Sequence, residues 1–197
     1  MYHSVFLLQE LGTITQGLSV SRYRDSNGVF ESIVNVKDLE NLYIDHDVEK
    51  IELNSTASIQ QHRLEKNDVI IAIRGSLLKS SVVTEASVGS FAGQNVAVFR
   101  PTSLERVNPG YIAVLLRSKW MEQSSNVLQR RSSTNLPSIR ISDLREIKIS
   151  LPEIIFQNHI NQLFSLLESH KRIMLNTLKA REELTEMALI QVLGEVK

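Results

Sequence analysis

The sequence predicts an α+β protein in which a β-rich domain, with a curved or barrel-like sheet and packed helices, precedes one long C-terminal helix. Short Val- and Ile-rich segments alternate with polar turns over residues 1–105, and helical periodicity fills the last quarter of the chain. With 197 residues, 42% of them hydrophobic, the chain can form one domain of roughly 150 residues and the helix. We expect the domain over residues 1–151 and the helix over residues 152–197.

The expected strands are rich in branched residues and are separated by Asn, Asp, Gly and Ser, which favour turns. They cover Ser32–Val36, Lys50–Leu53, Val69–Arg74, Ser81–Val83 and Val96–Arg100.

A helix is predicted after these strands. Asn108 has the character of an N-cap, and Pro109 suits the first helical position because its missing N–H has no partner there. Apolar residues with helical spacing continue this pattern: Tyr111, Ile112, Leu115, Leu116, Trp120 and Leu128. The following stretch, QRRSSTNLPS at 129–138, is polar and basic and is predicted to be a loop.

The last quarter begins with a predicted strand, Arg145–Pro152, and continues as a helix from Phe156 with no glycine before Gly194. A helix of about 40 residues is ~60 Å long, so its apolar stripe needs a partner, either a second helix of the same kind or another protein. The stripe consists of Ile160, Leu163, Leu167, Met174, Leu178, Leu184 and Ala188.

Composition excludes several classes of protein. The chain has 22 basic and 22 acidic residues, so no global basic field indicates nucleic-acid binding. No apolar run approaches the ~20 residues of a membrane span, and the N-terminus lacks the features of a signal peptide, so we expect a cytoplasmic protein without a membrane partner. The absence of cysteine removes thiolate nucleophiles, cysteine-bound zinc and disulfides.

Catalytic motifs are also missing. The sequence contains no glycine-rich phosphate loop, no G-x-S-x-G and no H-E-x-x-H. The nearest enzyme-like group is Asp143 with Glu146 and Lys148, which suits a surface salt bridge better than a nuclease site. The residues by themselves therefore show little catalytic apparatus.

Side chains of the type that contact DNA occur at the expected strand ends and in the basic loop. Arg, Lys, Asn, Gln and Ser donate hydrogen bonds to phosphates and base edges, although solvated loops have the same composition. The candidates are Arg74, Ser76, Lys79, Gln94, Asn95, Arg130, Arg131, Ser133, Asn135 and Arg140.

The order of motifs resembles the target recognition domains of type I restriction-modification specificity subunits. The clearest part is VIIAIRGSLLKSSVV, which reads as a strand, an Arg-Gly-Ser turn, a lysine and a second strand. Gln157 before the long helix resembles the entry to the family's coiled-coil region. The elements follow the family's order: Leu11-Gly12 to Gly17, FESIVNVKDL at 30–39, VIIAIRGSLLKSSVV at 69–83, GQNVAVFRP at 93–101, SSTNL at 132–136 and IKISLP at 147–152. Glu153 stands where the family commonly has a second proline.

Family members usually carry two recognition domains and two such helices, so this chain resembles a half-subunit. The resemblance implies that two copies pair their helices as an antiparallel coiled coil and read a palindromic, bipartite target in double-stranded DNA. It also implies that the chain itself catalyses nothing and binds no cofactor or metal. It would recruit adenine methyltransferase subunits that use S-adenosylmethionine and, where the system restricts DNA, a translocase that uses ATP and Mg²⁺.

Several alternatives stay open. The partner helix can come from a second copy or from a different half-subunit, and a nuclease or other enzyme that uses Asp143, Glu146 and Lys148 is a weaker hypothesis. The apolar stripe, which His170, Arg181 and Thr185 interrupt, either forms the pairing seam or partly faces the methyltransferase subunits. The whole chain could instead be a coiled-coil adaptor whose β-rich domain binds protein, in which case DNA affinity should be absent.

Overall fold

The computed structural model describes residues 4–54, 57–124 and 137–194 of the chain. It divides into two compact units, Met1–Asn161 and Gln162–Lys197, and each is considered by itself. The first unit holds all the β-structure and the second is helical, as the sequence predicts.

A five-stranded mixed sheet forms the centre of the first unit, in the spatial order β2-β9-β6-β7-β4. Its antiparallel pairs place Ile71 opposite Ser80 in β6 and β7, and opposite Ala97 in β9. The four residues of β6 and the four of β7 are all buried, which fits their continuous apolar or small-polar sequence. The strands are β2 Gly12–Gln16, β4 Tyr43–Ile44, β6 Val69–Ala72, β7 Ser80–Val83 and β9 Val96–Pro101.

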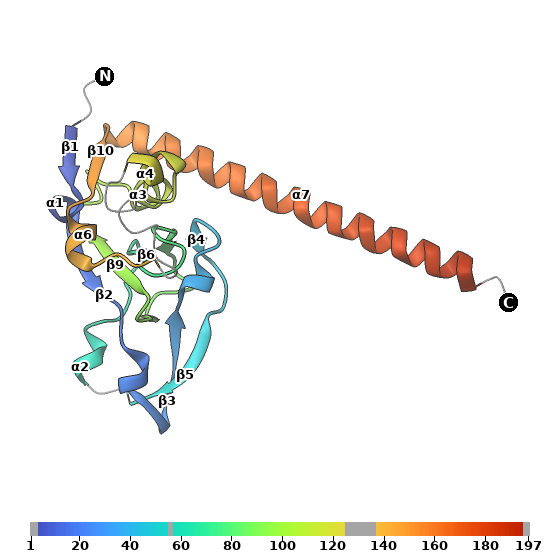
Figure 1. Ribbon diagram of the computed structural model, residues 1–197, viewed down its shortest axis with the longest axis horizontal. Coiled ribbons are helices and arrows are strands. Elements are labelled where there is room, and N and C mark those ends of the chain that lie inside the picture. Colours follow the sequence, from blue (N-terminus) through green and yellow to red (C-terminus); the bar gives the residue numbers. More distant parts are fainter. Residues whose placement is uncertain (1–3, 55–56, 125–136, 195–197) are drawn as a thin grey trace. The chain divides into compact units, whose positions relative to one another are not determined.

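Two smaller sheets complete the β-structure. One has the order β5-β3-β8, with β3 Arg24–Val34, β5 Glu49–Leu53 and β8 Phe91–Ala92. Figure 1 shows β3 and β5 side by side. The other pairs β1 Ser4–Leu7 with β10 Lys148–Leu151, and so joins the two ends of the first unit's sequence.

Two clusters of buried hydrophobic residues supply part of the core in the described ranges. One includes Ile70, Val83 and Val98 on the five-stranded sheet. The other lies under the β3–β5 pair and includes Ile33, Leu53 and Phe91. The predicted strands therefore supply the core, as their composition indicates.

The predicted strand at 32–36 and the predicted helix after Asn108 have different bounds in the structure. Strand β3 begins at Arg24, ahead of Ser32, because the chain makes an irregular turn around Gly28 and pairs again with Leu53. Helix α3 Pro109–Leu116 ends two residues before α4 Lys119–Ser124 begins. The Ser118 hydroxyl donates to the carbonyl of Leu115 and accepts from the Met121 N–H, which ends one helix and caps the next.

The shorter elements are α1 Leu8–Leu11, α2 Ala57–Gln60, α6 Ile141–Arg145 and the 3₁₀ turns Val20–Arg22 and Val36–Asp38. Helix α6 replaces the start of the predicted strand at 145–152, which is limited to β10. Asp143 accepts a hydrogen bond from the Arg140 N–H at 3.4 Å and so lies at the N-terminal turn of α6.

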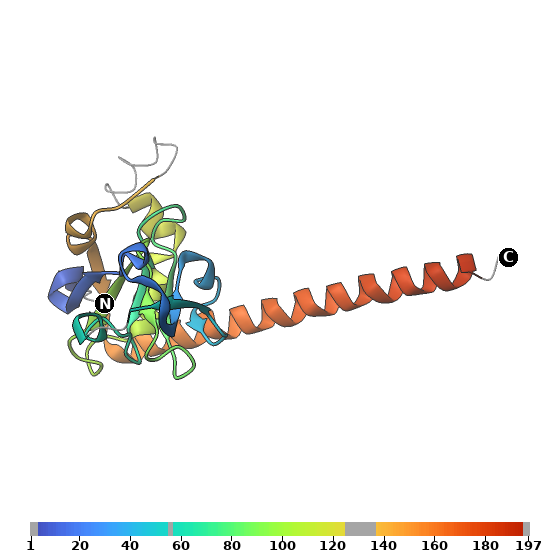
Figure 2. The same ribbon diagram turned by 90° about the horizontal axis from the view of Figure 1, so that it is seen from below.

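Helix α7 covers Ile154–Gly194, 41 residues, and Figure 2 shows it as one continuous helix. Its first two turns, up to Asn161, belong to the first unit. Gln157 there is 0% exposed. Its amide accepts from the Asn108 N–H at 2.9 Å and donates to the carbonyls of Arg106 and Pro152 at 3.0 and 2.8 Å.

A second contact holds the same two turns. The Tyr43 hydroxyl donates to the Asn161 side chain at 2.9 Å. Gly110 of α3 faces that side chain so closely that a Cβ at Gly110 would overlap it. A larger residue at Gly110 would therefore have to displace the Asn161 side chain from its bond with Tyr43.

The second unit consists of the rest of α7 and is exposed along its length in the single chain. No described helix is long and apolar enough to cross a membrane. Large apolar side chains on this segment are exposed, among them Leu163 at 68% and Leu184 at 66%.

Candidate nucleic-acid interface

Three segments that are distant in the sequence meet at the C-terminal end of β6. The Ile73 N–H donates to the Asn95 carbonyl at 3.0 Å, and the Ile139 N–H donates to the Ile73 carbonyl at 2.8 Å. The Gly75 N–H donates to the Pro137 carbonyl at 3.1 Å. These bonds bring the segments 73–75, 94–95 and 137–140 together, which we call the β6-end cluster.

Four predicted DNA-contacting residues belong to the β6-end cluster: Arg74, Gln94, Asn95 and Arg140. Arg74, Gln94 and Arg140 are exposed, and Asn95 is half-buried. Within the described ranges, neither Arg74 nor Arg140 makes a salt bridge, so both guanidinium groups can accept an anionic partner. The cluster thus offers two cations and two amides on one part of the surface.

The loop after β6 has an unusual backbone conformation. Gly75 has a φ of 75° and Leu78 has a φ of 59°, in the left-handed region that favours glycine. Leu78 is buried, and its N–H donates to the Ala72 carbonyl at 3.0 Å. The buried leucine therefore holds the loop in place, and Ser76 is left exposed at its tip.

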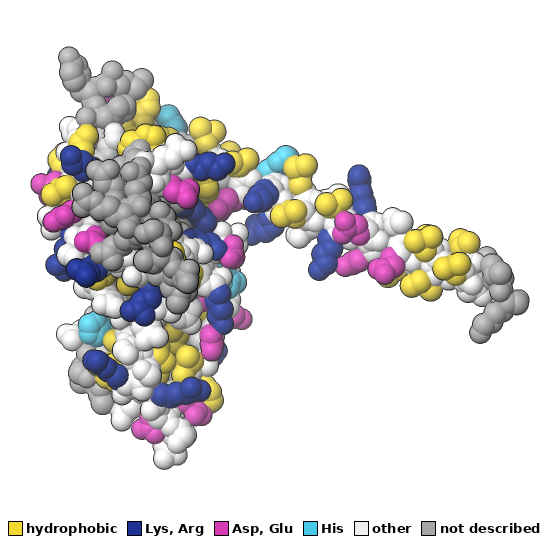
Figure 3. Space-filling view, in the orientation of Figure 1, with side chains coloured by type: hydrophobic (Ala, Val, Ile, Leu, Met, Phe, Trp, Pro, Cys, Tyr) yellow, Lys and Arg dark blue, Asp and Glu magenta, His cyan; other side chains and the backbone are white. Residues whose placement is uncertain are grey.

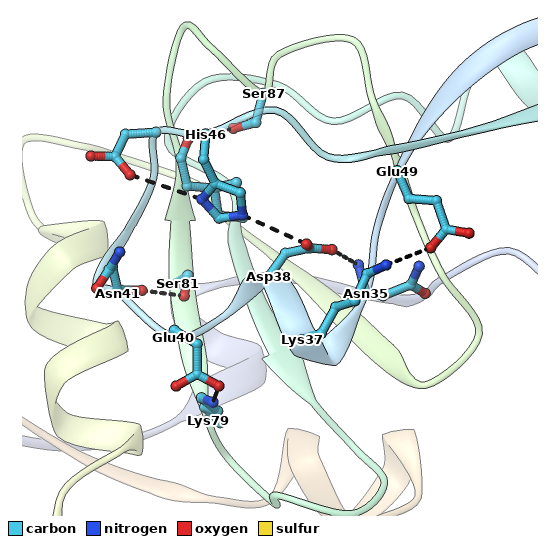
Figure 4. A network of polar contacts seen from close by, with 12 residues as sticks. Asn35, Lys37, Asp38, Glu40, Asn41, His46, Glu49, Lys79, Ser81 and Ser87 are labelled. Carbon is cyan, nitrogen blue, oxygen red and sulfur yellow. Dashed lines mark hydrogen bonds and ion pairs between the residues drawn. The ribbon is translucent and has the colours of Figure 1, made fainter. Parts of the chain in front are cut away.

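Lys79 is engaged inside the domain, unlike the arginines of the β6-end cluster. Its ammonium pairs with the carboxylate of Glu40, as Figure 4 shows. The hydrogen bond from Lys79, and then its charge, lower the pKa of Glu40. Arg117 donates to the Glu40 carbonyl at 2.8 Å, so two cations hold the segment that carries Glu40.

A pocket of about 650 Å³ lies beside this loop. It is lined by Gly75, Ser76, Leu77, Leu78, Lys79, Leu116, Arg117, Ser118, Glu122 and Pro137. The remaining predicted contacts, Arg130, Arg131, Ser133 and Asn135, lie outside the described residues.

Two further arginines are structural. Arg100 donates to both carboxylate oxygens of the fully buried Asp68, at 2.7 and 2.8 Å. That hydrogen bonding is the main cause that raises the pKa of Arg100. Arg63 pairs with Glu31 at 2.7 Å and lies over the ring of Phe91. These cations are compensated within the domain and are poor candidates for DNA contact.

The long helix carries a segregated charge pattern that sequence reasoning missed, although a count of charge along the helix would have found it. Figure 3 shows basic side chains preceding acidic ones along α7. We define a basic segment, Lys171, Arg172, Lys179 and Arg181, and an acidic segment, Glu182, Glu183 and Glu186. Glu168 is the one acid that precedes the basic segment on the described second unit.

The described chain is a β-rich unit followed by a long helix with an exposed apolar stripe. A family model for the type I restriction modification DNA specificity domain matches residues 4–186. The chain therefore belongs to that family, as the order of its motifs predicts.

Solved structures with this fold include specificity subunits. The chain is similar to a structure from work on the complex assembly and conformational transition of the type I R-M system. The TM-score is 0.68, with 17% identity over 98% of this chain and 49% of that one. It is also similar to the HsdS subunit of Thermoanaerobacter tengcongensis, with a TM-score of 0.58 and 20% identity over 85% of this chain and 38% of that one.

A third similar structure is the type I S subunit of M. genitalium, with a TM-score of 0.56 and 14% identity over 93% of this chain and 43% of that one. The chain thus spans about half or less of the length of these structures. No curated protein matches it.

Proposed function

We propose that this chain is the DNA sequence-specificity component of a type I restriction-modification system and reads half of a bipartite target. The observation that supports this most is the family match, which includes both the β-rich domain and most of α7. The one β-rich unit and one long helix of this chain, which covers 38% of the HsdS subunit of Thermoanaerobacter tengcongensis, fit one recognition domain and one helix of such a subunit.

In this proposal the β6-end cluster contacts DNA. Arginine and the amides of Asn and Gln make bidentate bonds to guanine and adenine edges, and Arg also binds phosphate. Ser76 at the loop tip and the basic loop at 130–135 add polar contacts. Lys79 joins them only by giving up its pair with Glu40.

The second half of the target is read by a second copy that pairs through α7. The seam residues of the sequence prediction, from Ile160 to Ala188, are all exposed in the single chain. Burying such a stripe against an identical stripe removes apolar area from water in both copies.

Charge supports an antiparallel arrangement of the two helices. An antiparallel pair whose two-fold axis lies near residue 179, close to where the basic segment gives way to the acidic one, brings the basic segment of one copy beside the acidic segment of the other, whereas a parallel in-register pair brings like charges together. An antiparallel pair of identical helices has a two-fold axis, so the DNA target should be palindromic with a gap.

Catalysis belongs to partner subunits in this proposal. The chain, acting in the cytoplasm, recruits adenine methyltransferase subunits that bind S-adenosylmethionine and, where the system restricts DNA, a translocase that uses ATP and Mg²⁺. It contributes sequence choice and spacing and holds no cofactor itself.

The test is salt-dependent binding of the purified chain, alone and with its methyltransferase subunits, to duplex DNA. We expect affinity that falls as salt rises, because the cluster's cations displace counterions from phosphates. A variant with Arg74→Ala and Arg140→Ala should bind less tightly and show a smaller salt dependence. Absence of DNA affinity in both preparations would favour the protein-binding adaptor instead.

A further inference from the structure

The β3–β5 pair forms a two-stranded ribbon with two chemically different faces. In its regular part, Phe30 is paired with Glu52, Glu31 with Ile51, and Ser32 with Lys50. Since β8 pairs only with Ile33 and Val34, no described strand covers the other edge of β3 ahead of Ile33. We call Val29–Ile33 with Glu49–Leu53 the β3–β5 ribbon.

One face of the ribbon belongs to the core. Ile33, Ile51 and Leu53 pack in the cluster with Phe91. Because side chains alternate along a strand, Phe30 and Ser32 point to the opposite face, together with their partners Glu52 and Lys50. On this outer face Phe30 is 66% exposed and Lys50 is exposed, whereas Ser32 and Glu52 are half-buried.

The outer face carries a set of groups that matches the base edges of the major groove. Lysine donates to guanine, a carboxylate accepts from the amino group of cytosine, serine does either, and a phenyl ring contacts the methyl group of thymine. Two strands about 4.8 Å apart fit within the ~12 Å width of the groove. Phe30 belongs to neither core cluster, so core packing does not explain why a large phenyl ring stands at this position.

Internal ion pairs neutralise part of the charge around the ribbon. Its acids Glu31 and Glu49 are neutralised by Arg63 and Lys37, each at 2.7 Å, and Figure 4 shows the second pair. Arg22, Arg24 and Lys50 make no salt bridge with any described residue. After internal pairing, these three cations share this part of the surface with the acids Asp25, Asp47 and Glu52, so the charge is balanced and the side-chain pattern of the outer face carries the argument.

We propose that the outer face of the β3–β5 ribbon, with Phe30 at its centre, enters the major groove of the DNA target and reads bases there. This rests on the proposed function and adds a second contact surface to the β6-end cluster. Phe30 and its neighbours then determine part of the sequence preference, while Arg22 and Arg24 hold the flanking phosphates.

The experiment is selection of binding sites from a duplex library with a randomised core, by the full chain co-purified with its methyltransferase subunits. The wild-type chain is compared with Phe30→Ala, Glu52→Gln and Val29→Ala. Val29 is the matched control, because it is a neighbour of Phe30 on the same strand, is 60% exposed and points to the opposite face. Thermal melting followed by circular dichroism establishes that each variant is folded.

We expect Phe30→Ala to lose the preference at one or two adjacent positions of the selected motif and to bind the wild-type motif roughly 5- to 150-fold more weakly. Glu52→Gln, which keeps the shape of the side chain, should alter the preference at a neighbouring position. Val29→Ala should keep the wild-type motif.

A wild-type motif and affinity in both outer-face variants would overturn the inference while leaving the proposed function intact. The inference would also be overturned if an outer-face variant kept its DNA binding but no longer co-purified with the methyltransferase subunits. The ribbon would then be a protein interface. A wild-type complex that enriches no motif would contradict the proposed function, and the inference with it.

Discussion

Gln157 joins the start of α7 to the β-rich unit through three hydrogen bonds made by one fully buried amide. Replacing Gln157 with Leu keeps the approximate volume but leaves an N–H on Asn108 and two carbonyls without partners. Each buried polar group that loses its partner costs about 1–3 kcal/mol. Burial of the leucine side chain returns about 2 kcal/mol. We expect Gln157→Leu to lower the free energy of unfolding by about 4 kcal/mol.

Equilibrium urea denaturation of the full chain, followed by circular dichroism and by Trp120 fluorescence, measures this change. A matched control is Asn158→Ala, which removes only the 2.7 Å bond from the Asn108 amide to an exposed side chain. The control should cost less than about 1 kcal/mol. A loss below about 1 kcal/mol for Gln157→Leu would refute the reasoning, because water or a neighbouring group would then satisfy the three partners.

Gln157→Glu adds a test of sign. One carboxylate oxygen can still accept from Asn108, but the other would face the carbonyls of Arg106 and Pro152 without a proton to donate. The folded state should therefore favour the protonated acid and raise the pKa of the introduced group. The folded protein then binds more protons than the unfolded one, so stability should be highest at low pH and fall as pH rises through the raised pKa. Stability that rises with pH over this range would contradict the hydrogen-bond assignment.

Three further predictions concern the helix and the core. Leu167→Asp should weaken dimerisation at least about 100-fold, because each copy would bury an unpaired carboxylate. A variant that is still dimeric at micromolar concentration in analytical ultracentrifugation would exclude Leu167 from the seam. Reversing the acidic segment to lysine should weaken the homodimer. Adding a chain with the basic segment reversed to glutamate should restore pairing as a salt-sensitive heterodimer, which native mass spectrometry detects. Unchanged homodimers would exclude the antiparallel register. Tyr111→Phe removes a 2.6 Å bond to the Ser150 carbonyl and should cost about 1 kcal/mol at neutral pH. Burial raises the pKa of Tyr111 above its ordinary value of 10.0, so the tyrosine ionises first in the unfolded chain and the wild type loses stability as pH rises above that value. Urea titrations in which Tyr111→Phe loses as much stability as the wild type over this pH range would contradict this.

The secondary structure was predictable where one local signal dominated. The Val- and Ile-rich strands β6, β7 and β9 lie near their predicted positions because burial and β-propensity agree there. Asn108 caps α3 as expected, accepting from the Tyr111 N–H at 3.0 Å. The early start of β3 and the break after Leu116 were missed, because they depend on one irregular turn and one serine hydroxyl.

The candidate site was less predictable, because it depends on contacts between distant segments. Sequence reasoning chose Arg74 and Lys79 on the same grounds, yet Lys79 pairs with Glu40, 39 residues away, and Arg74 has no such partner among the described residues. The meeting of Arg74 with Asn95 and Arg140 arises from backbone bonds across the sheet end. Phe30 stood only at the start of the FESIVNVKDL element. Alternation alone does not predict its exposure, because Phe30 has the same parity along β3 as the buried Val34.

The most direct test of the proposed role is single-molecule sequencing of adenine methylation in cells that express this chain with its methyltransferase subunit, compared with cells that lack the chain. We expect methylation at a palindromic motif with a central gap, present only when the chain is expressed. An asymmetric motif would contradict pairing of two identical copies, and the absence of any chain-dependent motif would contradict the specificity role.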